Sequence, residues 1–337
     1  MESSIKFIFN PEHDLCLASG DVNFIPPAAA VRFAQEGKWI EKFMRAPGGV
    51  QLGSGAGKIV PWGWNSVLKR KLMDGGWPPE ILPSDVELEF IRENSRRELA
   101  VELLERLQGV PTILTHTYRI IAHSLEEIES FLSRNQRIVL KAPLSGSGKG
   151  VRFVTGELME TDRGWCRKTL QKQGAVIVEQ RMEILQEFAM LFECTPAAER
   201  PQGKVTFRGY SMFYASNGAY RGNILASNEY IENTLSRWIP EGKLHKVQEE
   251  IAHWLQEKLQ GRYIGFIGVD QFVCTHNGTM LYNPAMEINL RMTMGLIARN
   301  IYDFHKEEYS LGEATHCFEP EKGIILLPCS GLPQTLR

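Results

Sequence analysis

Three side chains in the second half of the chain, Asp270, Glu287 and Asn289, have the residue types and spacing of a site for a hard metal ion. They lie on two strand-like runs joined by Asn277-Gly278, a pair typical of a tight hairpin turn. If both carboxylates share a face of that hairpin, they repel each other unless a cation lies between them. Two carboxylates and an amide oxygen suit Mg²⁺, which completes its octahedron with water and phosphate oxygens.

The register of this hairpin decides whether the three side chains meet. With a two-residue turn, Asp270 faces Ala285, and strand alternation places Glu287 and Asn289 on the face of Ala285. The two carboxylates are then diagonal neighbours. Pro284 could introduce a bulge that shifts this register. The alternative is a solvated sheet face without a ligand, but the apolar neighbours of these residues favour the metal site.

A glycine-rich segment earlier in the chain has the composition of a phosphate-binding loop. A buried strand is predicted over 137–141, ending in Lys141, and another apolar run follows at 151–154. The residues of the loop between them are Ser145, Gly146, Ser147, Gly148, Lys149 and Gly150. Glycines let backbone N–H groups converge on an anion, and a lysine adds a point charge for phosphate. The alternative is a flexible hairpin turn. Because the pattern is strand-loop-strand, it is neither a Walker A loop nor a dinucleotide fingerprint, both of which need a helix start.

A second glycine-rich segment, at 53–58, imitates a P-loop. Three residues separate Gly53 from Gly57-Lys58, one fewer than in a P-loop. In addition, Ile59 occupies the position where a P-loop has a Ser or Thr that binds the metal. We therefore predict an ordinary turn at this segment.

Strands and helices that would position these segments alternate along the chain. Apolar periodicity predicts helices over 94–107, 124–132 and 244–259, and a further helix from about residue 295; Ser124 is the expected N-cap of the second. Further strands are predicted at 6–9, 175–179, 186–193 and 205–214, the third of these half-buried. The stretch 46–83 is predicted to be irregular around one or two strands. The expected fold is an α/β N-terminal module followed by α+β modules built on antiparallel sheet.

Taken together, the loop and the acidic hairpin resemble the ATP-grasp superfamily over about residues 95 to 300. That family has a lysine at a strand end before a glycine-rich loop, which matches Lys141 and residues 145–150. It has a short strand ending in a glutamate before a hinge around adenine, and the run AVIVEQRM is similar. It also has an acidic residue on one strand and E-x-N on the next. The resemblance implies nucleotide contacts at Arg97, Lys141, Ser145, Gly146, Ser147, Gly148, Lys149, Gly150, Glu179, Gln180, Met182 and Glu187, and a metal site at Asp270, Glu287 and Asn289.

The resemblance also implies roles for particular residues. Glu187 would meet the ribose, and Arg291, two residues after the asparagine, would lie near the acceptor substrate. Lys141 and Arg291 would be catalytic. The family usually has a second phosphate-contacting lysine early in the first helix, where this chain has arginines, so Arg97 is the expected substitute.

The implied architecture has three parts. Residues 1–93 would form a substrate module of the kind that precedes an ATP-grasp fold, residues 94–182 a lobe with a glycine-rich lid, and residues 183–337 a lobe with the metal site. The implied activity is an ATP- and Mg²⁺-dependent, ADP-forming ligase that activates a carboxylate as an acyl phosphate for attack by an amine. Small-molecule substrates and a possible homo-oligomer are expected as partners.

Two other functions remain open at this point. The same scaffold could be a phosphotransferase acting on a small molecule, without ligation. It could also be a non-catalytic nucleotide-binding module, which intact Asp270, Glu287, Asn289 and Lys141 argue against. Near the N-terminus, the loop 12–14 (Glu-His-Asp) follows the first strand, where open α/β sheets bind ligands. The simpler interpretation of this loop is an N-cap at Asp14 and a solvated His13.

Composition excludes several classes of protein. The 337 residues suit two or three packed modules, and 43% apolar residues are enough for their cores. A formal net charge of −2 does not suit a protein that binds nucleic acid through bulk charge. The six cysteines include no C-x-x-C pair, so zinc or dithiol chemistry is not expected. With no signal-like N-terminus and no apolar run near the roughly 20 residues of a membrane span, we expect a cytoplasmic protein.

Overall fold

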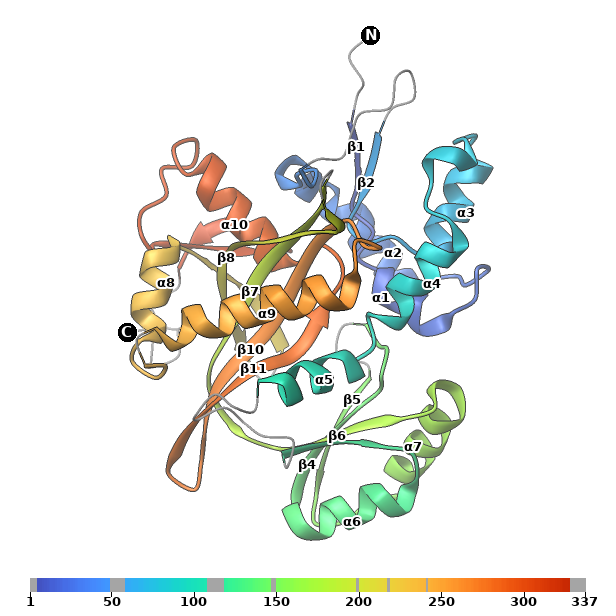
Figure 1. Ribbon diagram of the computed structural model, residues 1–337, viewed down its shortest axis with the longest axis vertical. Helices are drawn as coiled ribbons and strands as arrows, with labels where there is room; N and C mark the ends of the chain where they lie inside the picture. Colours follow the sequence, from blue (N-terminus) through green and yellow to red (C-terminus); the bar gives the residue numbers. More distant parts are fainter. Residues whose placement is uncertain are drawn as a thin grey trace.

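The structure is a computed structural model that describes residues 5–48, 58–107, 118–146, 150–197, 200–216, 219–240 and 242–327. The expected turn at 53–57 and the loop residues Ser147, Gly148 and Lys149 lie outside these ranges. The described chain is a mixed α/β fold with three sheets, and the two larger sheets are antiparallel. Figure 1 shows the two-stranded sheet at one end, the four-stranded sheet at the other, and the seven-stranded sheet between them.

The N-terminal part contains two short parallel strands, β1 (Ile5–Ile8) and β2 (Lys58–Pro61). Its helices are α1 (His13–Ser19), α2 (Ala28–Glu36), α3 (Ser66–Asp74) and α4 (Asp85–Glu93), with 3-10 turns at Gly37–Phe43 and Pro79–Ile81. The first strand was expected to be buried, but Ile5 and Lys6 are exposed, and burial begins at Phe9, just past the strand. Phe9 packs edge-on against Trp62, which follows β2.

Helix α3 corrects the expectation of irregular structure over 46–83. The Asn65 side chain caps this helix by accepting a hydrogen bond from the Leu68 N–H at 2.9 Å. Val67, Leu68 and Leu72 form its buried face. Glycine and proline on both sides hid this nine-residue helix from a periodicity argument.

The four-stranded sheet has the order β3-β6-β4-β5. Its strands are β3 (Arg119–Ala122), β4 (Arg137–Lys141), β5 (Val151–Thr155) and β6 (Val176–Gln180), and its helices are α6 (Leu125–Asn135) and α7 (Glu160–Gln173). Both helices lie against one side of the sheet (Figure 1), where Ile138, Leu140 and Val178 form the core with Phe131 and Cys166. The predicted N-cap is confirmed, because the Ser124 hydroxyl accepts a hydrogen bond from the Glu127 N–H. The opposite face of the sheet carries polar side chains, among them Lys141 and Glu179.

The seven-stranded sheet has the order β11-β10-β7-β8-β9-β12-β13. Its strands are β7 (Glu183–Ala197), β8 (Arg200–Ser216), β9 (Ala219–Leu225), β10 (Gly265–His276), β11 (Thr279–Asn289), β12 (His316–Glu319) and β13 (Gly323–Leu326). Its helices are α5 (Glu98–Arg106), α8 (Asn228–Leu235), α9 (Lys243–Leu259) and α10 (Met294–His305).

The central strand β7 was expected to be half-buried, but both of its faces are covered. Phe188 and Met190 pack in the core that contains α5 and α9. Ala189 and Leu191 pack in a second core with α10 and the N-terminal part. The alternation of large apolar residues predicted one covered face correctly. The second face is covered by segments far away in sequence, which no local pattern reveals.

The expected helix over 94–107 begins later, at Glu98. Residues 94–97 form a turn between α4 and α5, and the Arg97 N–H donates a hydrogen bond to the Pro143 carbonyl at 3.0 Å. This contact ties the turn to the segment that follows β4, and so it brings Arg97 to the glycine loop.

The hairpin of β10 and β11 has the predicted turn but a different register at its far end. Phe272 pairs with Asn283 as expected, whereas Asp270 pairs with Glu287 instead of Ala285. Strand β11 uses three residues, 284–286, where β10 uses Gln271 alone. Pro284 has no N–H for the ladder, and the Asn283 side chain accepts a hydrogen bond from the Ala285 N–H instead.

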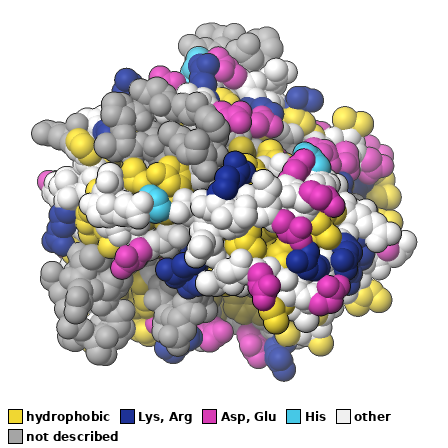
Figure 2. Space-filling view, turned by 90° about the horizontal axis from the view of Figure 1, so that it is seen from below, with side chains coloured by type: hydrophobic (Ala, Val, Ile, Leu, Met, Phe, Trp, Pro, Cys, Tyr) yellow, Lys and Arg dark blue, Asp and Glu magenta, His cyan; other side chains and the backbone are white. Residues whose placement is uncertain are grey.

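None of the helices in the described ranges is long and apolar enough to cross a bilayer. Cys16, Cys166, Cys194, Cys274 and Cys317 are free and buried. Acidic and basic side chains are interspersed over the face seen in Figure 2, in line with the small net charge.

Candidate active site

The acidic hairpin brings Asp270, Glu287 and Asn289 to one face of the seven-stranded sheet. The bulge places Asp270 directly opposite Glu287 on the neighbouring strand. Asn289 is two residues further along β11, and its Nδ2 donates a hydrogen bond to Asp270 Oδ2 at 3.0 Å. The shifted register therefore brings the two carboxylates closer than the diagonal arrangement would.

The electrostatics of this trio favour an incoming cation. Burial, followed by the facing Glu287 carboxylate, raises the pKa of Asp270 from 3.8 to about 7. Arg291 and the Asn289 amide oppose this shift without cancelling it. A divalent ion would relieve the repulsion, and the donor set of two carboxylates and an amide oxygen fits the oxygen-only coordination of Mg²⁺. The described residues contain no cluster of three or more His, Cys, Asp or Glu side chains placed to hold a metal.

Arg97 links this trio to the glycine loop. Its Nη1 donates hydrogen bonds to the Ala142 carbonyl at 2.6 Å and to the Ser145 hydroxyl at 2.7 Å, while its Nη2 lies 3.0 Å from Glu287 Oε1. One guanidinium therefore touches the loop after β4 and the acidic strand β11. Its Nε is buried without a hydrogen-bond partner.

A second charged cluster lies on the face of the four-stranded sheet opposite α6 and α7. The Glu179 carboxylate pairs with Lys141 Nζ at 2.7 Å and with Arg119 Nη2 at 2.8 Å. Burial opposes ionisation of Glu179, but the two cations outweigh it and hold its pKa below the usual range. Burial lowers the pKa of Lys141, and Glu179 offsets this in part.

Arg119 also joins the two large sheets. Its Nη1 donates to the Ala285 carbonyl at 2.8 Å and its Nη2 to the Met286 carbonyl at 3.4 Å, both on β11 beside Glu287. Nothing in the sequence singled out this arginine. The available signal was one cation at the start of the apolar strand RIIA, facing the strand that ends in Glu179.

The other residues expected to contact nucleotide lie around these clusters. Gln180 ends β6, and Met182 packs with Tyr118, Phe272 and Met286 in a small apolar group. Glu187 lies on β7, where burial raises its pKa and the charge of Lys141 opposes the rise. Glu187 also contributes to the raised pKa of Asp270, so it lies near the acidic pair.

Two expected loop residues, Gly146 and Gly150, lie where the backbone is tightly packed. A Cβ on Gly146 would come within 2.9 Å of the Leu15 side chain, and a Cβ on Gly150 within 2.2 Å of the Ser145 Cβ. A side chain at Gly146 would force the Leu15 side chain to move, and one at Gly150 would clash with Ser145, so the loop ends pack against their surroundings.

Arg291 is held by the N-terminal part of the chain. Its Nε and Nη2 donate to the two oxygens of Asp14 at 2.8 and 2.7 Å, and Nη2 also donates to Asn289 Oδ1 at 2.8 Å. Burial opposes ionisation of Asp14, but Arg291 outweighs it and lowers the pKa of Asp14. Asp14 is therefore not an N-cap: Glu12 occupies that position, and Asp14 lies in the first turn of α1.

His13 is buried, which corrects the expectation of a solvated side chain. Its Nδ1 lies 3.2 Å from the Asn65 Nδ2, and the lack of a Cβ on Gly63 leaves room for its ring, since a Cβ would come within 2.6 Å. Burial lowers the pKa of His13 from 6.5 to about 4, so the ring is neutral at pH 7.

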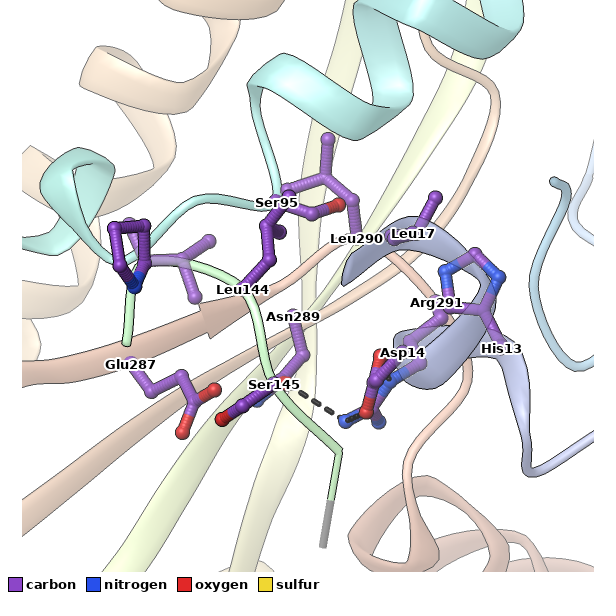
Figure 3. A pocket seen from close by; sticks show the side chains of 12 residues that line it. His13, Asp14, Leu17, Ser95, Leu144, Ser145, Glu287, Asn289, Leu290 and Arg291 are labelled. Carbon is purple, nitrogen blue, oxygen red and sulfur yellow. Dashed lines mark hydrogen bonds and ion pairs between the residues drawn. The ribbon is translucent and has the colours of Figure 1, made fainter. Parts of the chain in front are cut away.

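A pocket lies between these elements (Figure 3). Its lining comes from α1, the turn before α5, the loop after β4 and the end of β11. The lining residues are His13, Asp14, Leu17, Ser95, Pro143, Leu144, Ser145, Glu287, Ile288, Asn289, Leu290 and Arg291. The pocket thus joins the glycine loop and the acidic strand to the N-terminal loop 12–14.

The fold was also compared with known proteins. No family model matches the chain. No curated protein matches it either. Solved structures do match it. The N5-carboxyaminoimidazole synthetase of Staphylococcus aureus is 13% identical, with 88% of this chain and 72% of that chain covered and a TM-score of 0.45. The biotin carboxylase of Campylobacter jejuni is 14% identical, with 96% and 68% covered and a TM-score of 0.46.

A third match is the biotin carboxylase domain of the Hydrogenobacter thermophilus 2-oxoglutarate carboxylase, which is 14% identical with 80% and 56% covered and a TM-score of 0.47. At this identity and TM-score the matches carry no argument about function, and the chemistry must be argued from the residues of this chain.

Proposed function

We propose that this chain binds ATP with Mg²⁺ and uses it to activate a carboxylate as an acyl phosphate, releasing ADP, for attack by an amine. The observation that carries the proposal is the position of Arg97, which contacts Ser145 in the glycine loop and Glu287 in the acidic pair. The groups that we expect to bind phosphate and metal thereby meet at one point, which supports the proposal because transfer of a phosphoryl group requires both.

In this proposal the nucleotide lies between the four-stranded and seven-stranded sheets. Lys141, Arg97 and the loop 145–150 would bind the phosphates. Glu179, Gln180 and Met182 would border the adenine, and Glu187 would meet the ribose. Residues 1–93, 94–182 and 183–337 would then be the substrate module, the loop-bearing lobe and the metal-bearing lobe.

Asp270, Glu287 and Asn289 would hold the magnesium. When bound, the ion would neutralise charge on the phosphates during transfer. Arg97 already offsets part of the charge of Glu287, so it is placed to move between that carboxylate and a phosphate oxygen. Arg291, tied to the same group through Asn289, would stabilise the transferring phosphoryl group.

The reaction would consist of two displacements. An oxygen of the substrate carboxylate would bond to the γ-phosphorus while the bond to the bridging oxygen breaks and ADP leaves. The amine nitrogen would then bond to the acyl carbon while the carbon–oxygen bond breaks, and the leaving phosphate would take the bond's electron pair and the proton that the amine releases. The residues of this chain would bind, orient and screen charge in both steps.

The test is trapping with hydroxylamine. The protein is incubated with ATP, Mg²⁺ and pooled small carboxylates, and ADP and hydroxamates are measured. Carboxylate-dependent ADP release with hydroxamate formation is expected, and Asp270→Asn should reduce both by at least about a hundredfold. Glu102→Gln, a surface carboxylate on α5 paired with Lys258, is the matched control and should retain full activity.

Other outcomes would contradict the proposal. A stable phosphorylated hydroxyl compound without hydroxamate would indicate a phosphotransferase. Formation of AMP would contradict the ATP-grasp chemistry. Tight ATP binding with no turnover on any pool would indicate a nucleotide-binding module.

A further inference from the structure

Three charged side chains line the pocket of Figure 3, and their availability to a ligand differs. Asp14 and Glu287 carry negative charge and Arg291 carries positive charge, while Arg97 pairs with Glu287 but is not part of the lining. The exposed fractions of the carboxylate side chains are 26% for Asp14 and 29% for Glu287, against 17% for Arg291 and 8% for Arg97. The accessible charge at this pocket is therefore mainly negative.

Hydrogen bonds already occupy the arginines. Arg291 donates hydrogen bonds from Nε and Nη2 to the two carboxylate oxygens of Asp14. Its Nη2 also donates to Asn289, and its Nη1 donates to the Met292 carbonyl at 3.1 Å. Arg97 gives Nη1 to Ala142 and Ser145, and Nη2 lies against Glu287. Neither guanidinium presents an open fork, which is the geometry that binds a carboxylate well.

His13 adds no positive charge to the wall. It lies next to Asp14 in the sequence and also lines the pocket, and burial keeps its ring neutral at pH 7. A ligand carboxylate entering here would have to displace Asp14 from Arg291. The displaced Asp14 would be left without its counter-charge in a largely enclosed place, which is unfavourable.

A ligand ammonium group, in contrast to a carboxylate, could bind here without breaking an existing ion pair. It can donate to an Asp14 oxygen without breaking the pair with Arg291, because each carboxylate oxygen accepts more than one hydrogen bond. The hydroxyl of Ser95, which donates to the Ile91 carbonyl at 2.7 Å, keeps an acceptor site for a second N–H. Leu17 and Leu144 supply apolar contacts for a short alkyl chain.

We propose that the pocket beside Asp14 is the binding site for the amino group of the second substrate, and that Asp14 selects an amine over a carboxylate there. The assignment rests on the proposed ligase function for the identity of that substrate. Besides the role proposed for it in phosphoryl transfer, Arg291 then also positions Asp14, because it holds the Asp14 carboxylate with two hydrogen bonds at the edge of the pocket.

The experiment measures binding of three probes of equal size to the full-length chain, namely propylamine, propionate and 1-propanol. Binding is followed by the amide signals of Leu17 and Leu144 in the ¹⁵N-labelled protein, with and without ADP and Mg²⁺. We expect propylamine to bind at least about tenfold more tightly than propionate, with 1-propanol between them.

Asp14→Asn should weaken propylamine binding by about tenfold and leave 1-propanol unchanged. Asp85→Asn is the matched control, because Asp85 is an exposed carboxylate of the same N-terminal part, paired with Lys69. It should change neither. Propionate binding as tightly as propylamine in the wild type would overturn the proposal even if the Asp14 variant fails to fold. So would an Asp14 variant that binds propylamine within twofold of the wild type.

The test also separates this proposal from the ligase function. Amine binding at Leu17 and Leu144 without ADP formation on any carboxylate pool would support the amine site and contradict the ligase. Hydroxamate formation without amine binding at these residues would support the ligase and contradict the amine site.

Discussion

Two carboxylates on the two large sheets, the buried Glu179 and the half-buried Asp270, have opposite electrostatic surroundings. Glu179 on β6 lies between Arg119 and Lys141, and these cations hold its pKa low. Asp270 on β10 faces Glu287, and burial together with this neighbour raises its pKa to about 7. The first cluster has more positive than negative charge, whereas in the second Arg97 pairs with Glu287 and the repulsion at Asp270 remains.

The difference between these two clusters indicates which of them would be stabilised by an added cation and which by an added anion. A buried group that is already paired gains little from another ion, while two facing carboxylates gain much from a divalent one. The excess positive charge beside Glu179 suits phosphates, and the excess negative charge at Asp270 and Glu287 suits Mg²⁺. The proposed nucleotide-metal complex carries the two charges complementary to these clusters.

The largest expected effect comes from removing the negative charge of Glu179 from its cluster with Arg119 and Lys141. Glu179→Gln leaves Arg119 and Lys141 buried with an amide in place of their counter-charge, and we expect a loss of about 3–5 kcal/mol in the free energy of unfolding. Asp270→Asn removes a repelled charge and should be neutral or slightly stabilising in metal-free protein. Urea unfolding of both variants in chelator measures the contrast. An equal loss in the two variants would contradict the contrast between the clusters.

The next effect is the pH dependence of the unpaired cluster. The pKa of Asp270 is about 7 in the fold and 3.8 as the ordinary value, so the fold favours its protonated form. Its contribution to stability is fully present below about pH 4 and is lost as pH rises through 7, by up to about 4 kcal/mol.

This contribution is isolated by comparing Asp270→Asn with the wild type between pH 4 and 7.5. The variant should gain in relative stability as pH rises. The comparison is needed because His13, with its pKa lowered to about 4, loses stability as pH falls through the same range. A stability difference that stays constant with pH would show that Asp270 titrates normally.

A smaller effect comes from filling the cation-deficient cluster. Mg²⁺ with ADP at a hundredfold excess over its dissociation constant should stabilise the wild type by about 2.7 kcal/mol. It should also flatten the pH dependence, because a bound cation keeps Asp270 ionised. Thermal unfolding with and without chelator measures both. Asp270→Asn should lose most of the stabilisation, and the same gain in that variant would place the metal elsewhere.

The smallest expected effect is the difference between two neighbouring carboxylates in how far each raises the pKa of Asp270. Glu287 is the larger charged contributor to its raised pKa and Glu187 the lesser. Glu287→Gln should therefore lower the pKa of Asp270 more than Glu187→Gln does. Titration of the Asp270 carboxyl carbon by NMR in metal-free protein measures both shifts. The reverse order would indicate that β7, rather than β11, provides the facing carboxylate.

Local patterns predicted much of this arrangement. The alternation and turn at Asn277-Gly278 gave the hairpin, and the lysine before the glycine loop gave β4 and β5. Strand register past Pro284 could not be predicted, because a bulge depends on how β11 meets its neighbours. The expected set Asp270, Glu287 and Asn289 still meets, since two extra residues preserve the face.

The contacts that the sequence did not reveal join distant segments. Arg119 binds β11, and Asp14 binds Arg291, which follows β11. Burial of His13 depends on Asn65 and on the space at Gly63, which come together only after β1 and β2 pair. Hydrophobic periodicity predicts which face of a helix or strand is buried, but it does not predict which distant side chain covers that face.

The pair between Asp14 and Arg291 joins residues 277 positions apart in the chain. A ribosome releases the N-terminal residues first, so a nascent chain carries Asp14 long before its guanidinium partner exists. The wall of the pocket can therefore be completed only after residue 291 has been synthesised, and any chain that stops before this residue lacks it. Such truncated chains would be unable to assemble the pocket.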